Sequence, residues 1–195
     1  GDTLRVVTAV LAGLVNKELV SEIGRLGGKA AGISGVDGLI VTGRNKNREL
    51  GLTAEEVTCN PRLLRVLINN GYMPVVAPVC LNDELKGNEE INLLNVNGDT
   101  IAACIAASLQ ARELVFLTDV PGIYDDSKQL ISHIDSGTAR DMIESGTASG
   151  GMIAKLEAGM IASQQVALTR IIDGRVGHAL LDEIEGKGKG TTIVN

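Results

Sequence analysis

The chain has 195 residues, of which 44% are hydrophobic, 22% charged and 2% aromatic, and its formal net charge at pH 7 is −6. This composition is typical of a folded α/β-type domain and excludes a disordered or fibrous chain. The acidic balance, without basic clusters and interleaved aromatic residues, argues against nucleic-acid binding. No apolar run reaches the roughly 18 residues of a membrane span, and the start has no signal-peptide pattern. We therefore expect a cytoplasmic protein without a membrane partner.

The three cysteines, Cys59, Cys80 and Cys104, are widely spaced, and no histidines follow them at zinc-ligand intervals. Neither a disulfide framework nor a zinc site is expected from this pattern. The chain starts without Met at a helix-cap pattern, Asp2-Thr3. From this start we expect a fragment or a trimmed chain.

The predicted elements alternate between helices and strands. The first helix runs over 3–26, is broken near Gly13 and ends at Gly27-Gly28. A polar segment over 43–49 is predicted to lie in a surface hairpin. The other expected elements, in chain order, are a strand over 29–33, hairpin strands over 39–42 and 56–58, a helix from Asn60-Pro61 to Asn70-Gly71, a strand over 73–79 that ends near Pro78, a helix over 99–109, a strand over 114–118, helices over 139–144 and 152–165, a strand over 170–172, a helix over 178–185 and a strand over 191–194.

This alternation predicts a mostly parallel sheet with right-handed crossovers. The expected fold class is α/β, a three-layer αβα sandwich with an open, mainly parallel sheet. Ligands of such sheets bind at the carboxyl ends of the strands, so the loops that leave the strands are the segments to inspect.

The first of these segments, Asn92 to Thr100, places two amides and a carboxylate on alternate residues before a helix. Asn95, Asn97 and Asp99 can then point the same way. The structural interpretation makes Asp99 the helix N-cap and the asparagines turn formers. The functional interpretation makes the amides ligands of a small polar substrate, with Asp99 positioning a cationic group.

The second segment is a strand that ends in the turn Thr118-Asp119-Val120-Pro121-Gly122. Asp119 suits either a ribose hydroxyl or a turn cap. Pro121-Gly122 is an ordinary turn signal, so the structural interpretation is favoured for these residues taken alone.

The third segment is the most specific. Ser149-Gly150-Gly151 precedes a helix, and Lys155 lies about one turn inside it. Two glycines let backbone N–H groups approach an anion at a helix N-terminus, and the lysine can reach the same anion. This is a candidate phosphate site, although a plain helix start with a solvated lysine has the same pattern.

Two common nucleotide motifs are absent from the sequence. It contains no Gly-x-x-x-x-Gly-Lys-Ser/Thr, and the glycines at 188 and 190 lack the third glycine of a dinucleotide fingerprint. P-loop ATPases and standard dinucleotide dehydrogenases are thereby disfavoured.

Several motifs together resemble the N-acetylglutamate kinases of the amino acid kinase family over essentially the whole chain. The motifs are Gly13 to Glu18, Asn95 to Asp99, Leu117 to Gly122, Ser149 to Lys155 and Ile172 to Leu181. The resemblance implies ATP-dependent phosphorylation of the side-chain carboxylate of N-acetyl-L-glutamate in arginine biosynthesis, with Mg²⁺ held largely by ATP and no dedicated protein metal site.

The resemblance also implies roles for single residues. Asn95 and Asn97 would bind acetylglutamate, Asp99 would organise the catalytic lysines, and Lys155 would contact the transferred phosphoryl group. The nucleotide pocket would be lined by Thr118, Asp119, Gly122, Gly150, Gly151, Met152 and Lys155. His178 would belong to an arginine effector site, although a single His at a helix start also suits a cap or packing role.

By the same resemblance, residues 1–80 are the remainder of a substrate-binding and oligomerisation lobe, and residues 81–195 are the nucleotide-binding lobe. A homo-oligomer, dimer or hexamer, is implied. The family's first strand with a lysine, its glycine-rich turn and its substrate arginine would lie upstream of Gly1. A chain without these donors is expected to be weakly active or inactive alone.

Two alternatives stay open from the sequence. The first is a related kinase that acts on an aminoadipate derivative, aspartate, carbamate or UMP. The second is a non-catalytic, nucleotide-binding regulatory module. A NAD-dependent oxidoreductase fits the fold class but lacks the glycine fingerprint.

Overall fold

The computed structural model describes residues 2–45, 51–84, 92–125, 127–148 and 150–194. They form two compact units, Gly1–Leu109 and Gln110–Asn195. The boundary at Leu109 lies beyond the expected functional division at residues 80 and 81. That division would fall within strand β6, which pairs inside unit 1. Which lobe serves which ligand stays a prediction.

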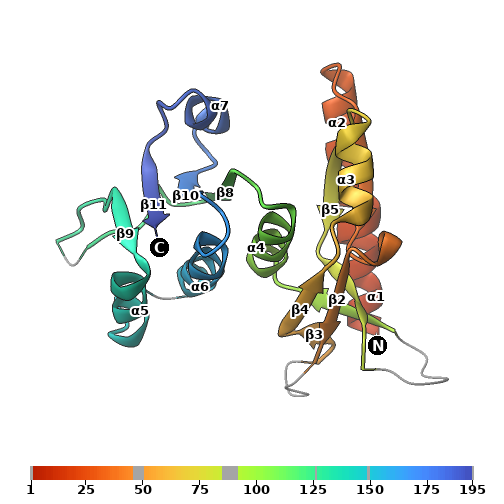
Figure 1. Ribbon diagram of the computed structural model, residues 1–195, viewed down its shortest axis with the longest axis horizontal. Coiled ribbons are helices and arrows are strands. Elements are labelled where there is room, and N and C mark those ends of the chain that lie inside the picture. Colours follow the sequence, from red (N-terminus) through yellow and green to blue (C-terminus); the bar gives the residue numbers. More distant parts are fainter. Residues whose placement is uncertain (1, 46–50, 85–91, 126, 149, 195) are drawn as a thin grey trace. The chain divides into compact units, whose positions relative to one another are not determined.

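Unit 1 contains helices around two small sheets (Figure 1). Its elements are α1 (Asp2–Thr8), η1 (Ala9–Val15), α2 (Asn16–Arg25), β1 (Ala30–Ser34), η2 (Asp37–Leu39), β2 (Val41–Arg44), β3 (Thr53–Ala54), β4 (Glu56–Cys59), α3 (Arg62–Asn69), β5 (Met73–Ala77), β6 (Val79–Asn82), β7 (Leu93–Val96) and α4 (Gly98–Leu109). Strands β1 and β5 form a parallel pair, and the other five form a mixed sheet in the order β3-β7-β6-β2-β4.

The first helix is confirmed, but it does not break near Gly13. Instead, its hydrogen bonding widens to a π-helix over η1, between two α-helical segments. Buried Asn16 then fixes the helix to the parallel pair, because its Nδ2 donates to Val75 O at 2.8 Å and to Ile33 O at 3.2 Å. Lys17 adds a hydrogen bond from Nζ to Gly32 O at 2.8 Å. Two residues of the first quoted motif therefore have a packing role.

The predicted strand over 73–79 is two strands. β5 ends at Ala77, and β6 begins at Val79 in a different sheet. Pro78 lies between them and has no N–H to donate, so it interrupts the ladder. The described residues form three sheets, of two, five and four strands.

Unit 2 is a four-stranded sheet, in the order β8-β10-β11-β9, with helices on both of its faces. Its elements are β8 (Glu113–Thr118), β9 (His133–Asp135), α5 (Ser136–Glu144), α6 (Gly151–Ser163), β10 (Leu168–Asp173), α7 (Ala179–Ile184) and β11 (Gly190–Val194). Helix α6 packs on β10 and β11 through buried residues that include Leu156, Ile171 and Ile193. Arg170 alternates with Ile171 and so faces the opposite side, where it pairs with Glu183 of α7.

The α/β class is confirmed, and the sheets are mainly parallel. Of the eight strand pairings among the described residues, five are parallel and three antiparallel. None of the described helices is long and apolar enough to cross a membrane.

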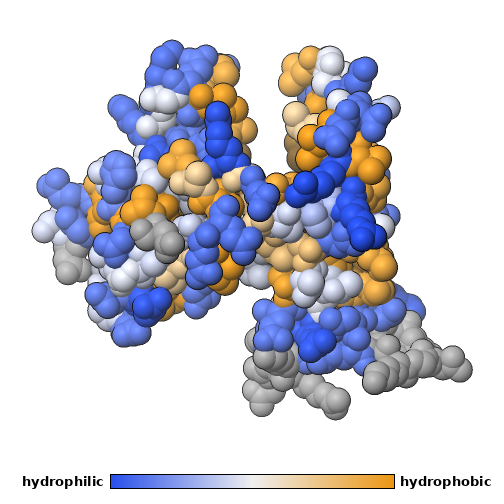
Figure 2. Space-filling view, in the orientation of Figure 1, coloured by the Kyte–Doolittle hydropathy of each residue, from blue (hydrophilic) through white to orange (hydrophobic). Residues whose placement is uncertain are grey.

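Hydrophobic side chains remain on the surface of unit 1, over its helices (Figure 2). Val6, Val10 and Leu14 follow each other at four-residue spacing and are 62%, 41% and 58% exposed, whereas Leu4 is buried. Residues at this spacing share one face of a helix. The first helix thus has one apolar side in the core and part of another facing solvent.

A disulfide joins Cys59, at the end of β4, to Cys104 of α4. The two Cα atoms are 6.0 Å apart, within the usual range for a disulfide. The expectation that the cysteines stay unpaired is therefore wrong for this pair. Cys80 is free and buried, and burial raises the pKa of its thiol to about 11.

We expect reduction of this disulfide to lower the free energy of unfolding of unit 1 by about 2–4 kcal/mol, since the link closes a loop of 45 residues in the unfolded chain. Urea unfolding with and without dithiothreitol measures the loss. Cys59→Ser is the control, because its stability should no longer respond to dithiothreitol. A count of three free thiols in unreduced, denatured protein would contradict the pairing.

Candidate functional site

The predicted substrate block begins on a strand that the sequence analysis missed. β7 covers Leu93–Val96, with Leu94 and Val96 buried in the core of unit 1. Asn95 alternates with these two residues and therefore points to the other face of the strand. Its backbone is fixed on both sides, since it lies opposite Val79 of β6 and Thr53 of β3.

Asn97, and not Asp99, is the N-cap of α4. Its Oδ1 accepts hydrogen bonds from Asp99 N at 2.8 Å and Thr100 N at 3.3 Å. This geometry is that of a capping side chain. The oxygen of Asn97 is thus committed to the helix, and only its NH₂ group can serve a ligand. Asp99 lies half-buried in the first helical turn, where the helix dipole favours a carboxylate.

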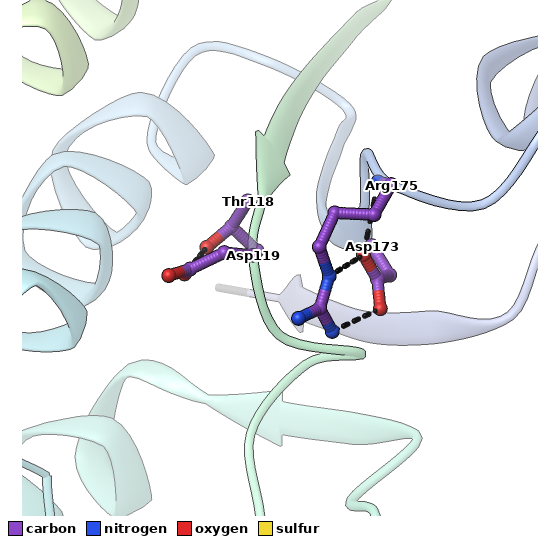
Figure 3. Close-up of polar contacts among 4 residues, drawn as sticks. All are labelled: Thr118, Asp119, Asp173 and Arg175. Atoms are coloured by element: carbon purple, nitrogen blue, oxygen red, sulfur yellow. Dashed lines mark hydrogen bonds and ion pairs between the residues drawn. The ribbon is translucent and has the colours of Figure 1, made fainter.

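The nucleotide candidates lie in unit 2, where β8 and β10 run parallel and end side by side (Figure 3). Thr118 is the last residue of β8 and lies opposite Asp173, the last residue of β10. Gly174 N donates to Thr118 O at 2.8 Å, which ties the two strand ends together. Thr118 Oγ1 donates to Asp119 Oδ1 at 3.2 Å, so the two predicted residues are in contact.

Arg175 and Asp173 form a charged pair at the same edge (Figure 3). Asp173 accepts three hydrogen bonds from Arg175: from the backbone N at 3.0 Å, from Nε at 2.9 Å and from Nη2 at 2.8 Å. These bonds lower the pKa of Asp173 to about 2. They also raise the pKa of Arg175, and the charge of Asp119 acts in the same direction.

The sequence predicts no role for this pair, although both residues belong to the motif from Ile172 to Leu181. A usable signal was present, because an Asp and an Arg two residues apart directly follow a predicted strand. Side chains at that place lie at the carboxyl edge of a parallel sheet, where ligands bind.

We expect Arg175→Ala to raise the pKa of Asp173 from about 2 toward its ordinary value of 3.8, because the two hydrogen bonds from the guanidinium are lost while the bond from the backbone N of residue 175 remains. A carboxyl group whose pKa is lower in the folded state stabilises the fold above about pH 4, and this stabilisation disappears as the pH falls through about 2. The difference in free energy of unfolding between the unsubstituted protein and Arg175→Ala should therefore decrease as the pH falls and disappear below about pH 2.

Carbon-13 NMR titration of the aspartate carboxyl groups measures this shift. Asp135 is the internal control, since its pKa is lowered by hydrogen bonds from Thr138 and not by Arg175. An Asp173 titration that is the same with and without Arg175 would contradict the assignment of the pKa shift.

Gly122 has a φ of +152°, and a Cβ there would lie 2.6 Å from Thr191 Oγ1 and 3.1 Å from Thr191 N. The next residue, Ile123, donates its N–H to the same Oγ1 at 2.9 Å. Gly122 is thus packed against β11, and these contacts give it a structural role. Its predicted contact with a nucleotide stays untested.

The helix start at the phosphate candidate has the predicted form. Gly150 is the N-cap of α6 with a φ of +56°, a left-handed conformation that favours glycine. Among the described residues, no atom would come within 4 Å of a Cβ at Gly150 or Gly151, so this backbone is open to approach. Ser149, which belongs to the same motif, lies outside the described residues.

Met152 and Lys155 are half-buried in α6. Lys155 comes four residues after Gly151, about 6 Å along the helix axis, and helical side chains lean toward the N-terminus. The ammonium group can therefore reach an anion at the helix start. The N–H groups of the first turn and the helix dipole favour an anion at the same place.

His178 occupies the N-cap position of α7 in a left-handed conformation with a φ of +64°. Its side chain makes no capping hydrogen bond and is exposed. Neither structural interpretation, a cap or a packing residue, therefore fits His178. The proposed effector role is untested.

The predicted residues thus fall into two sets. Asn95, Asn97 and Asp99 lie in unit 1 around the start of α4, whereas the nucleotide candidates and His178 lie in unit 2. Within the described segments, no three His, Cys, Asp or Glu side chains gather as metal ligands.

Comparison with known proteins identifies the protein family of this chain. Residues 1–173 match the amino acid kinase family. An acetylglutamate kinase of Dehalococcoides mccartyi is 42% identical over 192 residues, which cover 98% of this chain and 71% of that protein. An acetylglutamate kinase of Porphyra purpurea is also 42% identical, over 98% of this chain and 68% of that protein. The solved structure of smu.665 from Streptococcus mutans has a TM-score of 0.81 at 21% identity, over 99% of this chain and 72% of that one.

The chain belongs to the amino acid kinase family. The expected enzyme class, a kinase with a carboxyl group as phosphate acceptor, is confirmed by this family match and by the name of the relatives.

Proposed function

We propose that this chain carries the phosphate-binding part of an enzyme that transfers the terminal phosphoryl group of ATP to the side-chain carboxylate of N-acetyl-L-glutamate, which forms an acyl phosphate, and that these 195 residues alone are weakly active or inactive. The observation that carries the proposal is the start of α6. There the open backbone of Gly150 and Gly151 and the side chain of Lys155 can meet one anion. The relatives named acetylglutamate kinase, at 42% identity, support this acceptor.

The transfer does not require a general base to deprotonate the acceptor. A glutamate side chain with an ordinary pKa near 4.3 is already ionised at pH 7. The protein must instead align two anions that repel each other and offset the charge that develops on the phosphoryl oxygens. Lys155 and the N–H groups of the first turn of α6 supply positive charge of the required kind.

We further propose that Asn95 and Asn97 bind acetylglutamate and that Asp99 positions cationic groups. Because Asn97 Oδ1 caps α4, its NH₂ group would donate to the substrate. Thr118, Asp119, Gly122 and Met152 would line the nucleotide pocket of unit 2.

Mg²⁺ would be held largely by the phosphates of ATP, because it keeps several of its waters and binds through substrate phosphates in kinase sites. When bound, it would add positive charge at the phosphates. The proposed nucleotide-binding lobe would include unit 2, and residues 1–80 would contribute to substrate binding and oligomerisation.

A homo-oligomer is proposed from the exposed apolar stripe of Val6, Val10 and Leu14. An arginine effector site that includes His178 is a separate proposal, supported by the exposed position of that side chain. Acetylglutamate-dependent turnover that is unchanged in millimolar arginine would dismiss the effector site.

The test combines titration calorimetry with ADP and Mg²⁺ and a coupled assay of ATP turnover. The proposal predicts ADP binding, and turnover that depends on N-acetyl-L-glutamate and not on aspartate or an aminoadipate derivative. Weak or absent turnover by these 195 residues agrees with the expectation for them alone. ADP binding without turnover on any acceptor in a longer form of the protein would favour a regulatory module instead. Turnover with another acceptor would move the assignment to a related kinase.

A further inference from the structure

The guanidinium of Arg175 is fixed and exposed at the same time. Its Nε and Nη2 both donate to Asp173, so the carboxylate holds the group along one edge, in a two-bond arrangement. The Arg175 side chain is nevertheless 64% exposed. A guanidinium held by its edge keeps its flat faces available for contact with a ligand.

The charges around Arg175 do not favour a phosphate group there. Asp173 pairs directly with the guanidinium, and the carboxylate of Asp119 is close enough to act on its charge. One positive group against two negative ones leaves this corner with a net charge of about −1 at pH 7. The positive groups suited to phosphates, Lys155 and the N-terminus of α6, lie on a different element of unit 2.

A nucleotide has a charged end and a neutral, flat end. The carboxyl edge of β8 and β10 offers a flat cation for the base and, at Asp119, an acceptor for hydroxyl groups. We propose that Arg175, held in place by Asp173, stacks on the base of the bound nucleotide and sets affinity at its nucleoside end. This inference rests on the proposed function, namely that unit 2 binds ATP.

The test measures binding of ADP and of inorganic pyrophosphate, both with Mg²⁺, to the 195-residue chain by titration calorimetry. Cation–π stacking is worth about 0.5–2 kcal/mol, so Arg175→Ala should weaken ADP binding about 2- to 30-fold. The affinity for pyrophosphate should stay within about twofold of its original value, since pyrophosphate has no base to stack.

The variant Arg175→Lys tests whether the planar shape of the guanidinium or its positive charge contributes to ADP affinity. Lysine keeps the positive charge but not the planar group, so this variant should lose most of the ADP affinity that Arg175→Ala loses. Arg140→Ala is the matched control, because Arg140 is an exposed arginine on α5 of the same unit. It should leave ADP affinity unchanged.

Two results would overturn the stacking proposal alone: unchanged ADP affinity in Arg175→Ala, or an equal loss of ADP and pyrophosphate affinity, which would indicate a phosphate contact. A chain that binds pyrophosphate but not ADP would also overturn it. If the unsubstituted chain binds neither, the proposed function fails together with this inference.

Discussion

Replacing Glu183 by alanine is expected to lower the free energy of unfolding of unit 2 by about 3–5 kcal/mol. Glu183 and Arg170 are buried together, with side chains 6% and 13% exposed. The Nε–Oε1 distance is 2.7 Å, and Nη2 donates to Oε2 at 3.0 Å. Truncation at Glu183 would leave the guanidinium buried without its countercharge.

The other contacts of Arg170 cannot offset this loss. Its guanidinium also donates to Thr192 Oγ1 and to Gly188 O, the latter at 3.3 Å, but both acceptors are neutral. Glu183→Gln keeps the size of the side chain and removes only its charge. We expect this variant to be less destabilised than Glu183→Ala, because the amide oxygen still accepts a hydrogen bond.

Urea unfolding followed by circular dichroism measures both variants. Glu185→Ala is the control, since Glu185 pairs with Lys187 on the surface, where the two side chains are 45% and 70% exposed. Exposed pairs contribute about 0–1 kcal/mol. If Glu183→Ala costs no more than this control, the buried pair does not stabilise unit 2 as argued.

The helices were predictable because their signals are local. Apolar spacing located the first helix, α3, α4 and α6, and Gly27 and Gly71 end their helices with φ values of +87° and +76°. Such signals require only neighbouring residues, which is why they are readable from one sequence.

The pairing of the strands was not predictable in the same way. β3 has two residues and β9 three, too few to show an alternating pattern, and β7 ends in residues that also suit a turn. The disulfide depends on the approach of residues 45 positions apart, which no local pattern encodes. Where sheets divide likewise depends on pairing across the chain, as at β5 and β6.

The residues of the candidate site show the same difference between local patterns, which were predictable, and pairing across the chain, which was not. The form of the helix start at Gly150 was predicted, because a glycine pair before a helix is a local pattern. The cap of α4 was assigned to Asp99 instead of Asn97, two residues earlier, because both residue types cap helices. The pair of Asp173 and Arg175 required knowledge that β10 ends beside β8.

Lys155→Ala is expected to reduce acetylglutamate-dependent ATP turnover by about 10²–10³-fold, the usual cost of one donor to a developing negative charge. This expectation rests on the proposed function. Lys155 lies one turn inside α6, where its ammonium group can reach the phosphoryl group at the helix start. Because the charge to be offset develops in the transition state, the loss should appear mainly in kcat.

Two measurements distinguish a contact of Lys155 with the transferred phosphoryl group from a purely structural role of this residue. Both require a form of the protein that turns over ATP. The dissociation constant of ADP should change far less than kcat, since ADP lacks the transferred group. Lys189→Met is the control, because Lys189 is an exposed lysine of the same unit and its loss should leave kcat unchanged. Turnover by Lys155→Ala within tenfold of the unsubstituted protein would show that Lys155 does not contact the transferred phosphoryl group.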